Sequence, residues 1–144
     1  MSSDLLTADD LSSAEWELVQ AARVAAERAY CRYSGYAVGA AIESASGRLF
    51  SGCNVENASY GATMCAERSA IFALVAAGER RIVRVCVYAP GEPMAMPCGM
   101  CRQVIAEFCE DAVVLVAGPR GVLKRSFARL LPEAFRLEPP ETEL

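Results

Sequence analysis

The sequence contains no histidine, and its 14 lysine and arginine residues are outnumbered by 18 aspartate and glutamate residues. Without histidine, any zinc site has to be built from sulfur and oxygen ligands. The net charge of −4 at pH 7 disfavours a nucleic-acid partner, because binding to a phosphate backbone depends mainly on lysine and arginine. No run of about 18 apolar residues could span a bilayer, and the start, Met1–Asp10, lacks the regions of a signal peptide. We therefore expect a cytoplasmic protein with no membrane partner.

Seven cysteines are present, an odd number. In a chain with no secretion signal they are better explained as reduced core thiols and metal ligands than as a disulfide framework. The cysteines at 31, 53, 86 and 109 lie in apolar surroundings, and we expect them to behave as small buried hydrophobic residues. With 53% apolar residues, the chain fits one compact domain over 1–144, with loose ends at about 1–10 and 138–144.

Helices are predicted by their start signals and by apolar spacing. Ser12 and Glu15 form a capping-box pattern, and the apolar stripe that follows ends near Tyr30 and should pack on a sheet. Similar spacing predicts further helices at Gly61–Ala77, Gly99–Cys109 and Ser126–Leu131.

Short apolar segments between these helices predict strands. Tyr36–Ile42 and Arg48–Val55 flank turn residues and should form a hairpin. The remaining strands are expected at Ile82–Tyr88, Val113–Ala117 and, at an edge, Val122–Arg125. Alternating helices and strands imply an α/β layer fold, a sheet of about five strands with helices on both faces.

Three cysteines carry the chemical signal. Cys65 precedes Ala66 and Glu67 at one expected helix start, and Cys98 and Cys101 form a Cys-x-x-Cys pair at another. Two thiols on the first turn of a helix can share one tetrahedral zinc, and the positive helix end favours the thiolates that zinc requires. Three cysteines leave the fourth position free for water, as catalytic zinc sites do.

Charged residues next to these cysteines are candidates for the rest of the chemistry. Glu67 can sit beside a zinc-bound water, where a carboxylate can take a proton and deliver it to a departing amine. Three thiolates weaken zinc as a Lewis acid unless cations offset their charge. Arg68 and Arg102 each follow a ligand segment, and we expect both to donate hydrogen bonds to ligand sulfurs.

Several ordered motifs are shared with a known family, and nearly the whole sequence resembles the cytidine deaminases of the small-nucleoside branch. The blocks that carry the resemblance are Tyr33-Ser34, Val38–Ala41, Gly52–Ala58, Cys65–Arg68, Pro97–Val104 and Leu130–Phe135.

This resemblance implies a three-layer α/β/α fold with a mixed sheet, a catalytic zinc and a homotetramer. It implies that a zinc-activated water attacks C4 of cytosine, while Glu67 protonates N3 and then the leaving ammonia. Cytidine and 2′-deoxycytidine would thereby become uridine and 2′-deoxyuridine, a reaction of pyrimidine salvage.

The resemblance also implies substrate contacts. Asn54 and Glu56 match residues that hold a ribose hydroxyl, and the backbone of Ala66 and Cys98 frames the base. Two aromatic residues complete the set: Tyr36 stands where the family has a stacking phenylalanine, and Phe135 matches an aromatic that reaches a neighbouring subunit's site. The family's usual proline and basic residue are replaced by Arg32 and Gly35, which alters the substrate rim.

Other interpretations remain open. A fourth cysteine would make the zinc structural, and a thioredoxin-like redox pair would leave Cys65 and Glu67 unexplained. A deaminase of a modified nucleoside such as blasticidin S shares the cysteine motifs, although the block at 54–58 favours an ordinary ribose. Each of these residues could also have an ordinary structural role. Glu67 could be a solvated acid, and Asn54 and Glu56 could organise a turn. Arg68 and Arg102 could form surface ion pairs, and Tyr36 and Phe135 could be packed aromatics.

Overall fold

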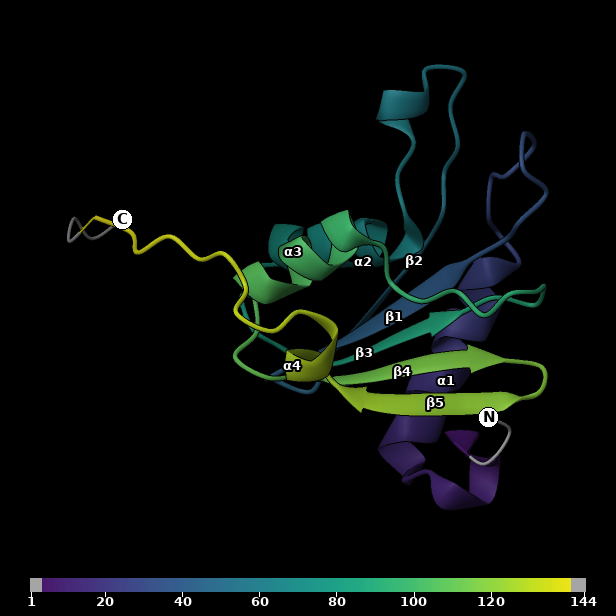
Figure 1. Cartoon of the computed structure of the whole chain (residues 1–144), viewed down its shortest axis with the longest axis horizontal. Helices are drawn as coiled ribbons and strands as arrows, with labels where there is room; N and C mark the ends of the chain where they lie inside the picture. Colours follow the sequence, from purple (N-terminus) through teal and green to yellow (C-terminus); the bar gives the residue numbers. More distant parts are fainter. Residues whose placement is uncertain (1–3, 141–144) are drawn as a thin grey trace.

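The computed structural model describes residues 4–140 and contains one five-stranded mixed sheet in the order β2-β1-β3-β4-β5 (Figure 1). The strands are β1 (Gly39–Ser44), β2 (Leu49–Cys53), β3 (Ile82–Tyr88), β4 (Val113–Gly118) and β5 (Gly121–Ser126). The helices are α1 (Ser13–Ala26), α2 (Ala66–Ala76), α3 (Gly99–Glu107) and α4 (Phe127–Leu130). The predicted α/β fold class is confirmed, and each predicted strand is present.

Strand pairing follows the predicted hairpin and edge. β1 pairs antiparallel with both β2 and β3, and β5 lies antiparallel to β4 at one edge. Between β3 and β4 the pairing is parallel, so the chain has to return across the sheet, and it does so through α3. As a result the loop after β3 delivers the start of α3 to the same end of the sheet as the start of α2 (Figure 1).

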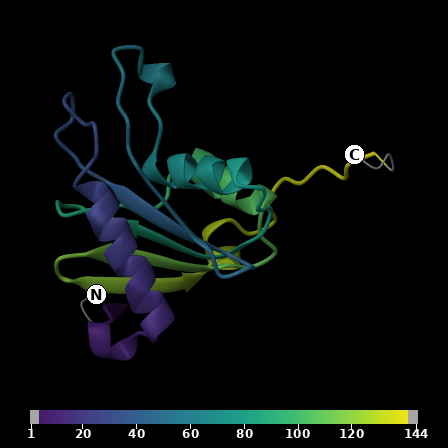
Figure 2. The ribbon, with the colours of Figure 1, turned by 180° about the vertical axis from the view of Figure 1, so that it is seen from behind.

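Helix α1 covers one face of the sheet. Ser12 caps it, with the Glu15 amide donating to Ser12 Oγ at 3.1 Å and the Ser12 amide donating to Glu15 Oε1 at 2.9 Å. Leu18 and Ala22 are fully buried against sheet residues that include Leu115. Figure 2 shows this helix lying across the face that is turned away in Figure 1.

Helices α2 and α3 cover the opposite face. Side chains alternate along each strand, so Ala40 and Ile42 of β1 pack towards α2 and α3 while Ala41 packs towards α1. Ile71 of α2 and Ile105 of α3 are fully buried in this larger cluster. The structure is therefore layered as helix, sheet and helix, as expected.

All four helices are shorter than predicted, α3 and α4 by only two residues each, and in the other two the backbone of the missing part is paired elsewhere. The first was expected to run to Tyr30, but Tyr30 exchanges backbone hydrogen bonds with Asn54 and Glu56 at 3.0 and 2.8 Å. Helix α2 was expected to begin at Gly61 but begins at Ala66, because Met64 pairs with Val55 through two 2.9 Å backbone hydrogen bonds.

The ends of the chain differ from each other. The expectation of a loose start is wrong for 6–10, since Leu6 pairs with Val122 at the β5 edge and Ala8–Asp10 form a 3₁₀ helix. The C-terminal segment extends away from the body in both Figures 1 and 2. Residues 1–3 and 141–144, also expected to be loose, lie outside the described part. Within 4–140, every helix is too short or too polar to cross a membrane.

Candidate active site

Three sulfur atoms meet where α2 and α3 begin. The Sγ atoms of Cys65, Cys98 and Cys101 all lie within 4.8 Å of one another, and those of Cys65 and Cys98 are 3.8 Å apart. Two sulfurs on one tetrahedral zinc at about 2.3 Å would be separated by about 3.8 Å, so the spacing fits the ion. The expectation that these three cysteines come together is confirmed. No fourth cysteine, aspartate or glutamate within residues 4–140 joins the cluster.

Both helix ends are arranged to present thiolates. Cys65 and Cys98 are the N-cap residues of α2 and α3, so both sulfurs lie near the positive ends of the two helices. A hydrogen bond from the Cys101 thiol, aided by Arg68, lowers the pKa of Cys65 to about 5. The same hydrogen bond, together with burial, raises the pKa of Cys101, which keeps the proton that it donates. These shifts favour the thiolate form at Cys65, which is the form that binds zinc.

The two arginines expected beside the sulfurs behave differently. Arg68 Nη2 donates a hydrogen bond to Cys65 Sγ at 3.4 Å, and Arg68 Nε is buried with no partner within residues 4–140. This guanidinium is thus partly buried beside the sulfurs, where water screens its charge less than at an open surface.

The expectation that Arg102 also donates to a sulfur is wrong. Its Nε donates to the carbonyl of Pro97 at 2.7 Å and its Nη1 to the carbonyl of Leu130 at 2.8 Å. Arg102 lies one residue past Cys101, and helical geometry turns it away from the sulfurs towards α4. It therefore ties the segment before Cys98 to the C-terminal part of the chain.

Glu67 lies in the first turn of α2 and is only 4% exposed. Burial raises the pKa of its carboxyl group, the hydrogen bond from its own backbone amide offsets part of this rise, and the negative charge of Cys65 adds a smaller increase. A buried carboxyl group with a raised pKa beside the three sulfurs is a candidate for proton transfer.

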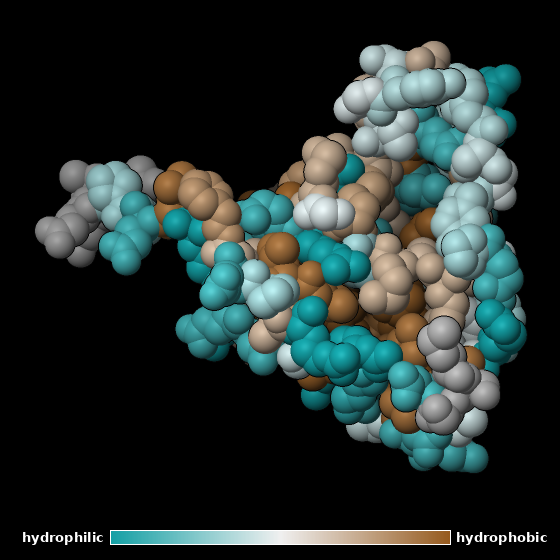
Figure 3. Space-filling view, in the orientation of Figure 1, coloured by the Kyte–Doolittle hydropathy of each residue, from teal (hydrophilic) through white to brown (hydrophobic). Residues whose placement is uncertain are grey.

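A cavity of about 470 Å³ opens onto the sulfurs and Glu67, a volume typical of small-molecule sites. Figure 3 shows hydrophobic side chains gathered at the centre of this side of the molecule, beneath the projecting loops. The cavity is lined by Tyr36, Val38, Asn54, Thr63, Met64, Cys65, Ala66, Glu67, Pro93, Met94, Ala95, Met96 and Cys98.

Among the expected substrate residues, Tyr36, Asn54 and Ala66 line this cavity. The Asn54 side chain also holds the chain in place, because its Oδ1 accepts from the Val38 amide at 2.9 Å and its Nδ2 donates to the Tyr36 carbonyl at 2.8 Å. Asn54 therefore fixes the position of Tyr36, in addition to any contact with a ligand.

Glu56 lies in a neighbouring hollow and not in the main cavity, although Thr63 lines both. Its carboxylate accepts hydrogen bonds from the amides of Tyr33 at 2.9 Å and Ser34 at 3.1 Å, and from the Ser34 hydroxyl at 2.5 Å. The Ser34 hydroxyl contributes most to lowering the pKa of Glu56. These bonds join the loop after α1 to the loop after β2.

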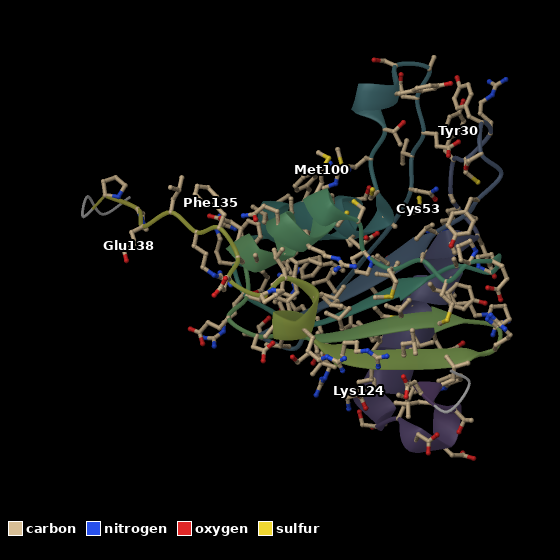
Figure 4. The ribbon with its side chains drawn as sticks, in the orientation of Figure 1. Tyr30, Cys53, Met100, Lys124, Phe135 and Glu138 are labelled. Carbon is tan, nitrogen blue, oxygen red and sulfur yellow. The ribbon has the colours of Figure 1, made fainter. Side chains whose placement is uncertain are left out.

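Phe135 does not line the cavity within residues 4–140 of its own chain. It is 68% exposed on the C-terminal segment, and Figure 4 shows it on this extended segment, away from Met100 at the start of α3. Gln103 of α3 donates a 2.9 Å hydrogen bond to the Phe135 carbonyl and holds this segment against the helix.

The sequence interpretation missed one wall of the cavity. Met64, Met94 and Met96 line the cavity, and two of them come from the loop between β3 and α3. Methionine side chains are flexible and polarizable, so this wall can adapt to the shape of a ligand. The sequence offered one signal for this wall, because Met64 directly precedes the metal-ligand candidate Cys65.

Comparison with protein families gives a match over residues 12–117 to the family described as the cytidine and deoxycytidylate deaminase zinc-binding region. The match spans all three clustered cysteines and Glu67.

Individual relatives agree with this match. Cytidine deaminase from Sporosarcina psychrophila is 42% identical over 124 residues, which cover 85% of this chain and 91% of the relative. A crystal structure of cytidine deaminase from Burkholderia pseudomallei superposes with a TM-score of 0.78 at 42% identity and covers 83% of this chain and 97% of that one. Blasticidin-S deaminase from Bacillus cereus is more distant, at 30% identity over 133 residues, 85% of this chain and 93% of the relative.

Proposed function

The chain belongs to the cytidine and deoxycytidylate deaminase zinc-binding family, and we propose that it hydrolyses cytidine and 2′-deoxycytidine to the uridine nucleosides and ammonia. The observation that carries this proposal is the adjacency of three clustered sulfurs and a buried glutamate at the floor of one cavity. The enzyme is a hydrolase whose cofactor is zinc.

Cys65, Cys98 and Cys101 would hold the ion, which when bound supplies the Lewis acidity that brings the pKa of a coordinated water near neutrality. Arg68 offsets part of the charge of three thiolates through its hydrogen bond to Cys65. Glu67, buried beside the sulfurs, would take one proton from the attacking water and deliver it to N3 of the base. It would then take the second proton from the same oxygen and deliver it to the departing amine, which leaves as ammonia.

The walls of the cavity suit a flat base with a sugar attached. Ala66 lines the cavity at the start of α2 with only a methyl side chain, so its backbone lies close to a bound base, and Tyr36 presents an aromatic ring to the same space. The Glu56 hollow lies next to this cavity, which supports a role for Glu56 at the ribose end. In the pyrimidine salvage that we propose, the products are free nucleosides.

The decisive experiment measures zinc per chain and then ammonia release from cytidine, 2′-deoxycytidine and blasticidin S by the same preparation. We expect close to one zinc per chain and turnover of the two ordinary nucleosides well above that of blasticidin S. Bound zinc with negligible turnover of cytidine would reject the proposal, and turnover confined to blasticidin S would establish the rival.

We further propose that the protein is a cytoplasmic homotetramer in which Phe135 reaches the cavity of a neighbouring subunit. Exposed aromatic side chains support an interface, since Tyr30, Tyr33, Tyr60 and Phe135 are between 48% and 82% exposed. Analytical ultracentrifugation should give a mass near four times the chain mass of 15.4 kDa. A monomer that retains full activity would rule out the neighbouring-site role of Phe135.

A further inference from the structure

The loop between β3 and α3 supplies a large part of the cavity wall but has few backbone hydrogen bonds of its own. Pro93, Met94, Ala95 and Met96 all line the cavity, and none of them belongs to a helix or strand. The one backbone hydrogen bond within this stretch joins the Met96 amide to the Met94 carbonyl at 3.0 Å. A wall of this kind depends on side chains from other parts of the molecule for its position.

Tyr36 provides such an anchor from across the cavity. Its phenolic hydroxyl donates a hydrogen bond to the Pro93 carbonyl, and a Cβ atom at Gly91 would lie 3.6 Å from its ring. The Tyr36 backbone is in turn fixed by Asn54 and by Ser34, whose Oγ accepts from the Tyr36 amide at 3.0 Å. Burial, with a contribution from Glu92, raises the pKa of the phenol, which therefore keeps its proton at neutral pH and remains a donor.

We propose that the Tyr36 hydroxyl is a positioning group that holds the loop between β3 and α3 over the cavity and so sets the affinity for the base. A phenylalanine at this position would present the same ring to the cavity but could not bind the Pro93 carbonyl. With the loop held in advance, less conformational freedom is lost when a nucleoside binds. The kinetic part of this inference rests on the proposed deaminase function, whereas the structural part does not.

A second contact to the same loop offers a matched control. Arg120 Nε pairs with Glu92 Oε1 at 2.9 Å, but both side chains are more than half exposed and neither lines the cavity. An exposed ion pair is worth little, so its removal should leave the loop in place.

Hydrogen–deuterium exchange of the zinc-loaded, full-length protein tests the structural part. In Tyr36→Phe we expect amides at 91–96 to exchange about threefold to tenfold faster than in the wild type, as loss of one partly buried hydrogen bond implies. Arg120→Gln should exchange these amides at close to the wild-type rate. Unchanged exchange in Tyr36→Phe, or an equal increase in both variants, would overturn the proposal.

Steady-state kinetics with cytidine test its consequence. We expect KM of Tyr36→Phe to rise by about threefold to tenfold and kcat to fall by a smaller factor, because the hydroxyl acts on the loop and not on the reacting atoms. A fall in kcat larger than the rise in KM would show that the hydroxyl serves the chemical step and would refute a positioning role. If the wild-type enzyme had no cytidine turnover, the proposed function would fail. The exchange experiment would still show whether the Tyr36 hydroxyl holds the loop.

Discussion

Arg102 donates a 2.7 Å hydrogen bond to the carbonyl of Pro97, the residue directly before Cys98, and so acts on the metal cluster through the backbone. Its other bond, to Leu130, joins the cysteine segment to α4 across 28 residues of sequence. A guanidinium can make both bonds at once from a fixed planar fork, which a lysine ammonium cannot reproduce.

Arg102→Lys should therefore weaken zinc binding by about tenfold or more, in the range seen when outer partners of a metal site are removed. Competition with a chelator measures this affinity without reference to turnover. Arg129→Lys, an exposed change on α4, serves as the control and should leave zinc affinity unaltered. Equal affinity in all three proteins would contradict the bracing role of Arg102.

Glu67→Gln should keep zinc and lower ammonia release by at least about 100-fold, because an amide of the same shape cannot transfer the proton. Glu107→Gln, at the exposed end of α3, removes the same charge away from the cavity and should keep wild-type activity. Retained turnover in Glu67→Gln would mean that another group moves the proton.

The pH dependence of stability should reveal Glu15. Burial of this side chain opposes ionisation, but hydrogen bonds from Lys124 and Ser12 prevail and place its pKa below the ordinary 4.5. Since the folded pKa is depressed, the stabilisation is complete above pH 4.5 and is lost as pH falls through the folded pKa. Glu15→Gln should thus cost about 1 kcal/mol of unfolding free energy near pH 7, and this difference should shrink below pH 4.5.

Denaturant unfolding of the wild type and Glu15→Gln at matched pH values measures that difference. Any loss of zinc at low pH affects both proteins, so it does not alter the difference between them. Glu17→Gln, on the exposed side of α1, is the control. A difference that stays constant from pH 7 to pH 3 would show that the charge of Glu15 is irrelevant to stability.

Gly39 marks the place where α1 lies closest to the sheet. A Cβ atom there would stand 2.0 Å from the Ala22 carbonyl oxygen and 2.4 Å from the Ala26 amide nitrogen, and neither backbone atom can move aside easily. Gly39→Ala should destabilise the fold by about 1–3 kcal/mol or more through overpacking. Gly61→Ala, where a Cβ atom meets nothing within 4 Å, should change stability by less than about 0.5 kcal/mol. Thermal unfolding that ranks the two variants equally would count against this packing.

Local sequence signals predicted those parts of the molecule that depend on local chemistry. The capping box at Ser12 and Glu15 is present as expected, and Gly78 closes α2 with a positive φ of 91°. β3 has the predicted bounds, Ile82–Tyr88, because β-branched residues bounded by turn signals are typical of a buried strand. The cysteine spacing likewise located the cluster.

Features that depend on distant partners were not predictable in this way. Nothing near Met64 in the sequence indicates that it pairs with Val55, yet this pairing delays the start of α2 to Ala66. The direction of the Arg102 side chain depends on where Leu130 lies, and that is settled by the packing of α4. The adjacency of Tyr36 and Pro93 depends on tertiary structure in the same way.

The hydrogen bonds that join the loop after α1 to the loop after β2 have a practical consequence for engineering. The backbone of Tyr30 is hydrogen-bonded to the backbone of Asn54 and Glu56, and the Glu56 carboxylate accepts hydrogen bonds from the amides of Tyr33 and Ser34. Grafting only one of these loops from a relative would leave several of these donors and acceptors mismatched. Substrate range should therefore be redesigned by exchanging both loops together as a single cassette.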